Sequence, residues 1–172
     1  MPIRDTHNNS EDAQAIADIY NFYIANSVAT FEEHAIDAND VLQRLQKVLG
    51  AGLPWLIAEQ NSRVQGYAYA SPWNPRSAYR NTCEISIYVA HQATGQRLGT
   101  HLYRELFARL KQKQLHIAIG GVTLPNPASV ALHEKFGMKK VAHFEQVGFK
   151  HNQWLDVGYW QVALAQIDLT AI

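Results

Sequence analysis

Cysteine is nearly absent from this chain, in which Cys83 is the only one among 172 residues. A single cysteine excludes an internal disulfide and is typical of a reducing compartment. The eight histidines show no metal-ligand spacing, because His133-Glu134 is not followed by a second histidine four residues after the first. We therefore expect neither a disulfide nor a bound metal.

Net charge and long apolar runs are absent as well. Fifteen Lys and Arg side chains balance fifteen Asp and Glu side chains, so the chain has no net attraction for nucleic-acid phosphates or anionic lipid. No run reaches the roughly 18 apolar residues that a membrane helix needs. Residues 1–9 are polar and lack the apolar core of a signal peptide. We expect a cytoplasmic protein without nucleic-acid or membrane partners.

Core-forming residues are plentiful, since 47% of the residues are hydrophobic. A chain of this length buries roughly two thirds of the surface that it exposes when unfolded. No Pro/Gly/Ser-rich stretch or shift in composition divides it. We predict one domain over residues 1–172.

Apolar residues at three- and four-residue spacing predict four helices. A polar cap or proline marks the start of a helix, and glycine marks its end. The first predicted helix begins at Ser10 as its N-cap, and the second runs from about Asn39 to Gly50-Ala51-Gly52. The third runs from Leu98 to about Gln114, and the fourth from Asn126-Pro127 to Gly137.

Short apolar or alternating runs predict strands around these helices. They are Trp55–Ala58, Val64–Ala70, Cys83–Val89, Ile117–Val122, about Lys139–Gln146 and Trp154–Leu164, with a loop at Gly148–Gln153. With a first short strand, the order is β-α-α-β-β-β-α-β-α-β-β. The strand-helix-strand unit in the middle is a parallel crossover, so we predict an α/β protein with a mixed sheet.

The loop Ala90–Arg97 after the third long strand leads into a helix at Gly95-Gln96-Arg97-Leu98-Gly99-Thr100. Unpaired amides and the helix dipole make such an N-terminus favourable for phosphate, and glycines let a ligand approach the backbone. The segment is neither a Walker loop nor a dinucleotide fingerprint. Taken alone, a turn of this kind also occurs in proteins that bind nothing there.

The segment Asn126–Met138 makes the phosphate interpretation specific. Its Asn, small residues, Leu-His and aromatic-Gly-apolar end resemble the second signature of the GNAT acetyltransferase superfamily, and Gly95–Thr100 then resembles the first. A closer resemblance, to the phosphinothricin N-acetyltransferase family, runs from about Ile3 to Leu164. It is carried by Ala70-Ser71-Pro72-Trp73 with Arg76 and Tyr79, Glu84 ahead of Ile87-Tyr88-Val89, Leu124-Pro125-Asn126, Leu132-His133-Glu134, and Val147–Gly158.

This resemblance implies the GNAT fold, acetyl-CoA as co-substrate and a homodimer. The implied cofactor-binding residues are the backbone of Ile87, Tyr88 and Val89, the side chain of Asn126, and the pyrophosphate loop Gly95, Gln96, Arg97, Leu98, Gly99 and Thr100. The usual first signature has glycine where this chain has Arg97. Arginine fits there if the position keeps an ordinary helical backbone angle.

Glu84 and His133 are the predicted catalytic residues. The resemblance implies that Glu84 accepts the ammonium proton, directly or through water; the alternative is a carboxylate paired with a nearby arginine. His133 lies where many GNAT enzymes have a tyrosine acid, and it would move a proton or hydrogen-bond the amine or thiolate. The alternative is a core histidine with satisfied hydrogen bonds. Cys83 alternates to the face opposite Glu84, and we expect it to be buried and inert.

The predicted acceptor site consists of Thr30, Phe31, Trp73, Asn74, Arg76 and Tyr79. Arg76 would hold an amino-acid carboxylate while the rings wall the pocket; alternatively, Trp73 and Tyr79 only cover the end of the sheet. The leading hypothesis is an acetyl-CoA-dependent N-acetyltransferase whose acceptor, of the phosphinothricin, methionine sulfoximine or methionine sulfone type, attacks the thioester directly. Two alternatives stay open: another amine as acceptor (polyamine, antibiotic or protein N-terminus), and a non-catalytic acetyl-CoA-binding module.

Overall fold

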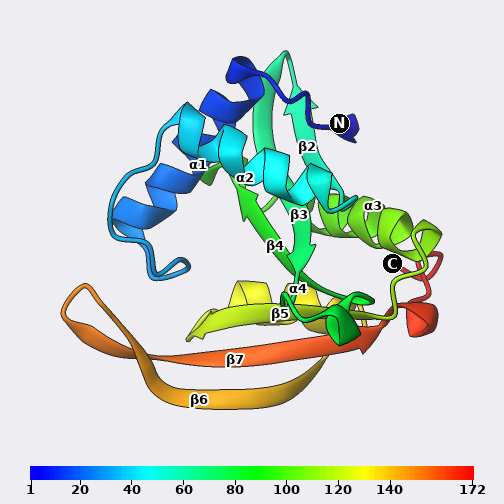
Figure 1. Ribbon diagram of the computed structural model, residues 1–172. Helices are drawn as coiled ribbons and strands as arrows, with labels where there is room; N and C mark the ends of the chain where they lie inside the picture. The colour runs from blue at the N-terminus through cyan, green and yellow to red at the C-terminus, as the bar shows by residue number, and fades with distance from the viewer.

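Seven strands form one mixed sheet in the order β1-β2-β3-β4-β5-β7-β6 in the computed structural model, which describes residues 1–172 (Figure 1). The strands are β1 (Ile3–Asp5), β2 (Trp55–Gln60), β3 (Arg63–Pro72), β4 (Thr82–Val89), β5 (Ile117–Leu124), β6 (Lys139–Lys150) and β7 (Gln153–Ala163). The helices are α1 (Ser10–Asn26), α2 (Ala38–Gly50), α3 (Leu98–Gln112) and α4 (Pro127–Lys135), with short 3-10 helices at Ser77–Tyr79, His91–Ala93 and Leu164–Gln166. The predicted mixed α/β fold and element order are confirmed.

The helix ends follow side-chain caps. Asn126 caps α4 by accepting from the amide of Ser129, as the predicted start at Asn126-Pro127 requires. The cap of α1 is Asn9, which accepts from the amide of Asp12, so the prediction of Ser10 was wrong by one residue. A side-chain oxygen at either position reaches the first turn, and Asn is as good a cap as Ser.

Two helices cover each face of the sheet, α1 and α2 on one side and α3 and α4 on the other (Figure 1). The buried apolar cluster between these layers has 33 residues and includes members of every strand from β2 to β5 and of β7. None of the helices combines the length and the hydrophobicity that crossing a bilayer requires.

The central strands β4 and β5 separate after a short parallel pairing, Thr82–Glu84 with Ile117–Ile119. On its other side β4 pairs with β3 over its whole length, from Val89 opposite Gly66 to Cys83 opposite Pro72. Beyond Glu84 one edge of β4 therefore has no neighbouring strand. Figure 1 shows the two strands diverging from this point.

The segment predicted as a loop, Gly148–Gln153, is mostly strand. β6 continues to Lys150, and only His151 and Asn152 form the turn before β7. Both have positive φ, 49° and 59°, the backbone of a tight two-residue hairpin turn that asparagine tolerates. The segment lies instead on a hairpin that projects from the sheet (Figure 1).

Candidate active site

One edge of β4 faces the gap that β5 leaves. The amide of Ala90 donates to the carbonyl of Gln65 over 2.8 Å, so Ala90 forms a hydrogen-bonded pair with the β3 side. In an antiparallel ladder every second residue points its amide and carbonyl the same way. The amides of Ile87 and Val89 therefore point into the gap, whereas the amide of Tyr88 points toward β3.

The hydroxyl of Tyr23, on α1, donates to the carbonyl of Val89 over 2.6 Å. This bond satisfies a carbonyl that has no neighbouring strand, and it ties α1 to the free edge of β4. The Ile87 and Val89 amides remain available to a ligand. A pantetheine arm, which carries amide groups of its own, would meet them as an added strand does.

A cavity of about 320 Å³ occupies the gap. Of the predicted site residues it is lined by Glu84, Ile87, Tyr88, Val89, Gly99, Asn126 and His133. A second hollow, of about 400 Å³, shares Val89 and Gly99 with it and adds Gly95, Arg97, Leu98 and Thr100. Gln96 lines neither hollow and is exposed. The structure thus brings the predicted catalytic residues and all of the predicted pyrophosphate loop except Gln96 to two adjoining hollows, together called the groove below.

The N-terminus of α3 presents free donors to this groove. Its first backbone hydrogen bond of the helical kind is from His101 to the carbonyl of Arg97, so the amides of Leu98, Gly99 and Thr100 have no acceptor inside the protein. A Cβ at Gly99 would lie 3.1 Å from Leu132 of α4, so glycine lets the two helices approach closely. Free amides at a positive helix end fit a diphosphate.

Arg97 does not have the ordinary helical backbone angle at which arginine would replace the usual glycine without strain. Its backbone is left-handed, with φ of 58° and ψ of 14°, and it serves as the N-cap of α3 without a side-chain cap. The turn still requires the geometry that a glycine supplies in the usual signature, and arginine adopts it at an energetic cost. Its side chain is exposed beside the free amides.

Glu84 is half-buried and has neither an ion pair nor a side-chain hydrogen bond. The alternative of a carboxylate paired with arginine is therefore not realised. Burial raises the pKa of Glu84 above the usual value of a glutamate, because the charged form loses hydration without gaining a partner. A carboxylate in this state is suited to accept a proton.

Gly121 of β5 leaves room beside this carboxylate. A Cβ at Gly121 would lie 3.6 Å from Oε1 of Glu84 and 3.0 Å from Cε1 of Tyr159. A Cβ here would be tight against Tyr159 and in ordinary van der Waals contact with Glu84, so glycine leaves more room beside the carboxylate.

His133 lies on the other face of β5. It is 3% exposed, and its ring packs so closely on Gly120 that a Cβ there would overlap it. Gly120 and Gly121 are consecutive strand residues and thus face opposite sides. Glu84 and His133 therefore reach the cavity from opposite faces of the sheet.

Both ring nitrogens of His133 are engaged. Nδ1 donates to the carbonyl of Ser129 over 2.7 Å, which leaves Nε2 to accept from the hydroxyl of Tyr103 over 3.2 Å. Burial lowers the pKa of His133, so the neutral ring is favoured. This geometry matches the alternative of a satisfied core histidine, placed at the wall of the cavity.

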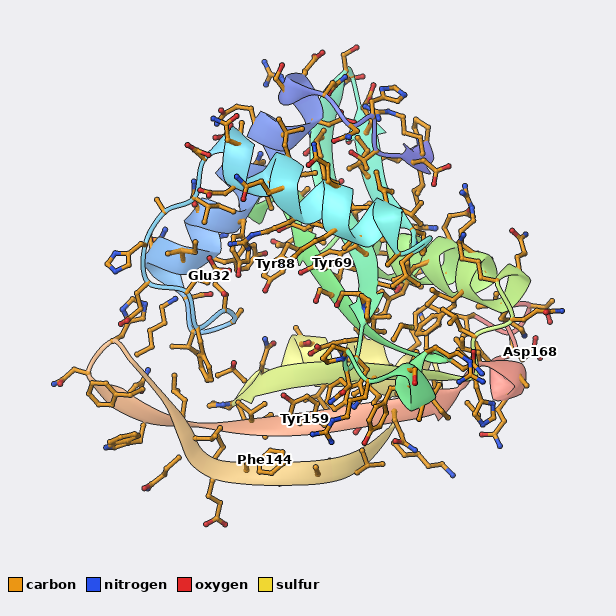
Figure 2. The ribbon with its side chains drawn as sticks, in the orientation of Figure 1. Glu32, Tyr69, Tyr88, Phe144, Tyr159 and Asp168 are labelled. Carbon is orange, nitrogen blue, oxygen red and sulfur yellow. The ribbon has the colours of Figure 1, made fainter.

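The predicted acceptor residues lie in three separate places. Trp73 lies edge-on to Tyr159, with 5.7 Å between ring centroids. Phe144, on the other strand of the hairpin, is 5.9 Å from the same ring (Phe144 and Tyr159 are labelled in Figure 2). These rings line the face that carries Glu84. Thr30 and Phe31 contact β6, as described below.

The third place holds Asn74, Arg76 and Tyr79. They line a separate hollow of about 470 Å³ together with Arg80 and Lys113, near the C-terminal ends of α2 and α3. This hollow shares no lining residue with the cavity of Glu84. The structure therefore does not bring Arg76 to the predicted acceptor site.

Three tyrosines at the site were not predicted from the sequence: Tyr23, Tyr103 and Tyr159. Tyr103 had a usable signal, because it follows Gly99 by four residues and so shares its helix face. Tyr23 had been placed on the buried face of α1 but given no role. Tyr159 reaches Glu84 through strand pairing that no local pattern reveals.

Cys83 is fully buried, and burial raises its pKa to about 12, so the thiol has the inert environment expected. No three His, Cys, Asp or Glu side chains are grouped in a way that would hold a metal ion.

Comparison with known proteins identifies the family. Residues 16–138 match the family model described as Acetyltransferase (GNAT) family. The chain is 39% identical over 163 residues to a phosphinothricin N-acetyltransferase of Alcaligenes faecalis, a match that covers 93% of this chain and 82% of that protein. It is 31% identical over 153 residues to an L-methionine sulfoximine/L-methionine sulfone acetyltransferase of Salmonella typhimurium, covering 89% and 90%.

A solved structure agrees with these relatives. A GNAT superfamily phosphinothricin acetyltransferase from Sinorhizobium meliloti, in complex with acetyl-CoA, matches with a TM-score of 0.90 and 33% identity, covering 94% of this chain and 87% of that one. The predicted family and enzyme class are confirmed. The chain belongs to the acetyltransferase (GNAT) family and is an N-acyltransferase.

Proposed function

We propose that this chain acetylates the free amine of a small amino-acid-like substrate of the phosphinothricin, methionine sulfoximine or methionine sulfone type, with acetyl-CoA as donor. One observation carries the proposal: Glu84 is a half-buried carboxylate without a partner, at the point where β4 and β5 separate. The relatives named above act on acceptors of this type.

The groove fits the donor. The free amides of Leu98, Gly99 and Thr100 would hold a diphosphate, the amides of Ile87 and Val89 would meet the pantetheine arm and the acetyl carbonyl, and Asn126 lies at the same wall. Bound acetyl-CoA supplies the acetyl group as an activated thioester.

Glu84 acts on the acceptor. Its carboxylate takes a proton from the ammonium group, directly or through one water, which leaves a neutral amine to attack the thioester carbon. Gly121 leaves the approach open, and the rings of Trp73 and Tyr159 flank it. On the opposite face His133 holds the hydroxyl of Tyr103 at the cavity wall, where this hydroxyl would donate a hydrogen bond or a proton to the departing thiolate.

The lining of the cavity favours an amino acid over a polyamine. Glu84 is the only acid among its lining residues, whereas a polycationic acceptor requires several carboxylates along its length. The aromatic wall suits a short, partly apolar side chain.

A thiol-release assay with acetyl-CoA and a panel of phosphinothricin, methionine sulfoximine, methionine sulfone and spermidine tests the proposal. We expect turnover with at least one of the first three amines and none with spermidine. Pure, folded protein that acetylates no amino acid would reject it. Calorimetric titration with acetyl-CoA distinguishes the enzyme from the non-catalytic alternative, because a binding module would bind acetyl-CoA but release no thiol with any of these amines.

The β6–β7 hairpin supports a homodimer as part of this proposal. β6 is an edge strand, and five apolar side chains of the hairpin are at least half exposed, with Trp154 the most exposed at 63%. They are Val141, Phe144, Val147, Phe149 and Trp154. Such apolar surface is typical of an interface. Sedimentation at micromolar concentration should give a dimer, and a monomer would refute this part.

Two smaller predictions belong to the same proposal. A lone, buried thiol at Cys83 is compatible with the cytoplasm. A shared apolar cluster that runs from α1 to β7 supports one domain over residues 1–172.

A further inference from the structure

The segment between α1 and α2, residues 27–37, contains no helix or strand, yet it forms part of the catalytic cavity. Ala29 lines the same cavity as Glu84. The backbone next to Ala29 must therefore be held in place if the cavity is to keep its shape. The loop lies opposite the tip of the β6–β7 hairpin (Figure 1).

Two contacts attach this loop to β6. Nζ of Lys150 donates to the carbonyl of Thr30 over 2.8 Å, across 120 positions of sequence. The ring of the next residue, Phe31, packs on Gly148 so closely that a Cβ there would overlap it. Gly148 and Lys150, two alternate residues of β6, thus contact the consecutive loop residues Phe31 and Thr30.

Lys150 occupies an unusual position for a lysine. It is 2% exposed and forms no ion pair. Burial lowers its pKa, and the negative charges of Glu32 and Glu33 oppose this effect. Burying an ammonium group without a contacting carboxylate is costly, and an apolar side chain would fill the same space more favourably. The buried ammonium group is thus a costly way to fill this space, and the hydrogen bond to the carbonyl of Thr30 is the contact that compensates it.

The loop side of this contact continues into α1 and α2. The hydroxyl of Thr30 lies 2.6 Å from that of Tyr20, which also donates to Glu32 over 2.9 Å. Glu32 in turn accepts two bonds from Arg44, at 2.8 and 2.9 Å (Glu32 is labelled in Figure 2). The loop is thus fixed on its helix side, and Lys150 is its attachment to the strand side.

We propose that Lys150 is a positioning residue for acceptor binding, which holds the Ala29–Phe31 wall of the cavity against the β6–β7 hairpin through the carbonyl of Thr30. The proposal rests on the acceptor site of the proposed function. Because Thr30 and Phe31 belong to the predicted acceptor site, loss of the contact should weaken binding of the amine and leave binding of acetyl-CoA unchanged.

The test compares Lys150→Met with Lys139→Met. Methionine keeps the length of the side chain and removes its charge; Lys139 is an exposed lysine of the same strand without a side-chain hydrogen bond, so it is the matched control. Amide hydrogen exchange of residues 28–33 and the KM values for both substrates are measured.

In Lys150→Met we expect exchange of residues 28–33 and the KM for the amine to rise about tenfold or more, the size of effect typical of losing a hydrogen bond to a charged group. The KM for acetyl-CoA and the behaviour of Lys139→Met should match the wild type. Unchanged exchange, or faster exchange with an unchanged KM for the amine, would overturn the proposal.

If Lys150→Met does not fold, Phe31→Ala removes the second contact of the pair and should act in the same direction. Exchange is measured without turnover. A wild-type protein that acetylates no amino acid would therefore defeat the proposed function, while the exchange result would still decide whether Lys150 holds the loop.

Discussion

Gly120 and Gly121 are neighbours in β5, yet they face two very different environments. Gly120 is buried against His133, whose two nitrogens both have hydrogen-bond partners. Gly121 is exposed and faces Glu84, which has none. One face of the strand is closed and satisfied; the other is open and holds an unpaired carboxylate. Adjacent residues of one strand thus face a satisfied, buried histidine on one side and, on the other, the unpaired carboxylate to which the proposed function assigns the chemistry.

The largest effect should come from Glu84→Gln. Removing a general base lowers kcat by about 10²–10⁴-fold. The Kd for acetyl-CoA should not change, because the groups proposed to hold it are backbone amides of β4 and α3 and not the Glu84 carboxylate. Steady-state rates together with calorimetric titration measure both quantities. A variant with wild-type turnover would show that Glu84 is not the base.

The pH profile of the wild type sharpens this test. The carboxylate must be ionised to accept a proton, and its pKa is raised by burial. The acid limb of kcat/KM should therefore lie at higher pH than the usual pKa of a glutamate, with activity lost as pH falls through the raised value. The limb should disappear in Glu84→Gln.

The two glycines themselves form a matched pair of variants. Gly120→Ala drives a methyl group into the ring of His133, and overpacking of this kind costs about 1–3 kcal/mol of stability. Gly121→Ala meets Tyr159 and Glu84 on the open face, so it should lower kcat/KM more than it lowers stability. Urea denaturation and steady-state kinetics of both variants are needed. Equal losses of stability in the two would contradict the contrast between the faces.

His133→Ala tests whether the closed face is structural. Loss of the imidazole leaves the hydroxyl of Tyr103 without its partner, at a cost of about 1–3 kcal/mol. Because burial lowers the pKa of His133, the folded protein resists protonation that the unfolded chain accepts. Wild-type stability should therefore fall as pH drops below the ordinary histidine value of about 6.5.

Urea denaturation at about pH 7.5 and about pH 5.5 measures this dependence. In His133→Ala the fall in stability between these two values should be smaller than in the wild type. An identical fall in both proteins would show that His133 is not the group responsible.

Local patterns predicted much of the fold. The helical period located α3 and α4, the cap at Asn126 located the start of α4, and Gly137 has the positive φ, 76°, that its predicted role as a stop requires. Alternation placed Glu84 and Cys83 on opposite faces of β4. These features depend on neighbouring residues, which is why one sequence suffices to find them.

Features that depend on distant pairing were missed. The contact of Tyr159 with the Glu84 region follows from the register of β7 on β5, and the contact of Lys150 with Thr30 joins residues far apart in the chain. The location of Arg76 in a separate hollow follows from the path of a loop whose residues have no period. Backbone angles in such segments are also invisible to pattern, as Arg97 shows.

Arg97→Gly should have the smallest effect, and it tests that backbone directly. A left-handed conformation costs a non-glycine residue about 1–2 kcal/mol, while added glycine entropy in the unfolded chain opposes the gain by about 0.4–1 kcal/mol. The variant should therefore be more stable by about 0–1.6 kcal/mol. Loss of an exposed guanidinium should weaken acetyl-CoA binding by no more than about 1 kcal/mol and reduce its dependence on salt.

Gln114→Gly is the matched control, because Gln114 has nearly the same φ, 57° against 58°, at the far end of α3. It should gain stability in the same way without any change in the Kd for acetyl-CoA, whereas equal changes of Kd in both variants would show that Arg97 contributes nothing specific to the donor groove.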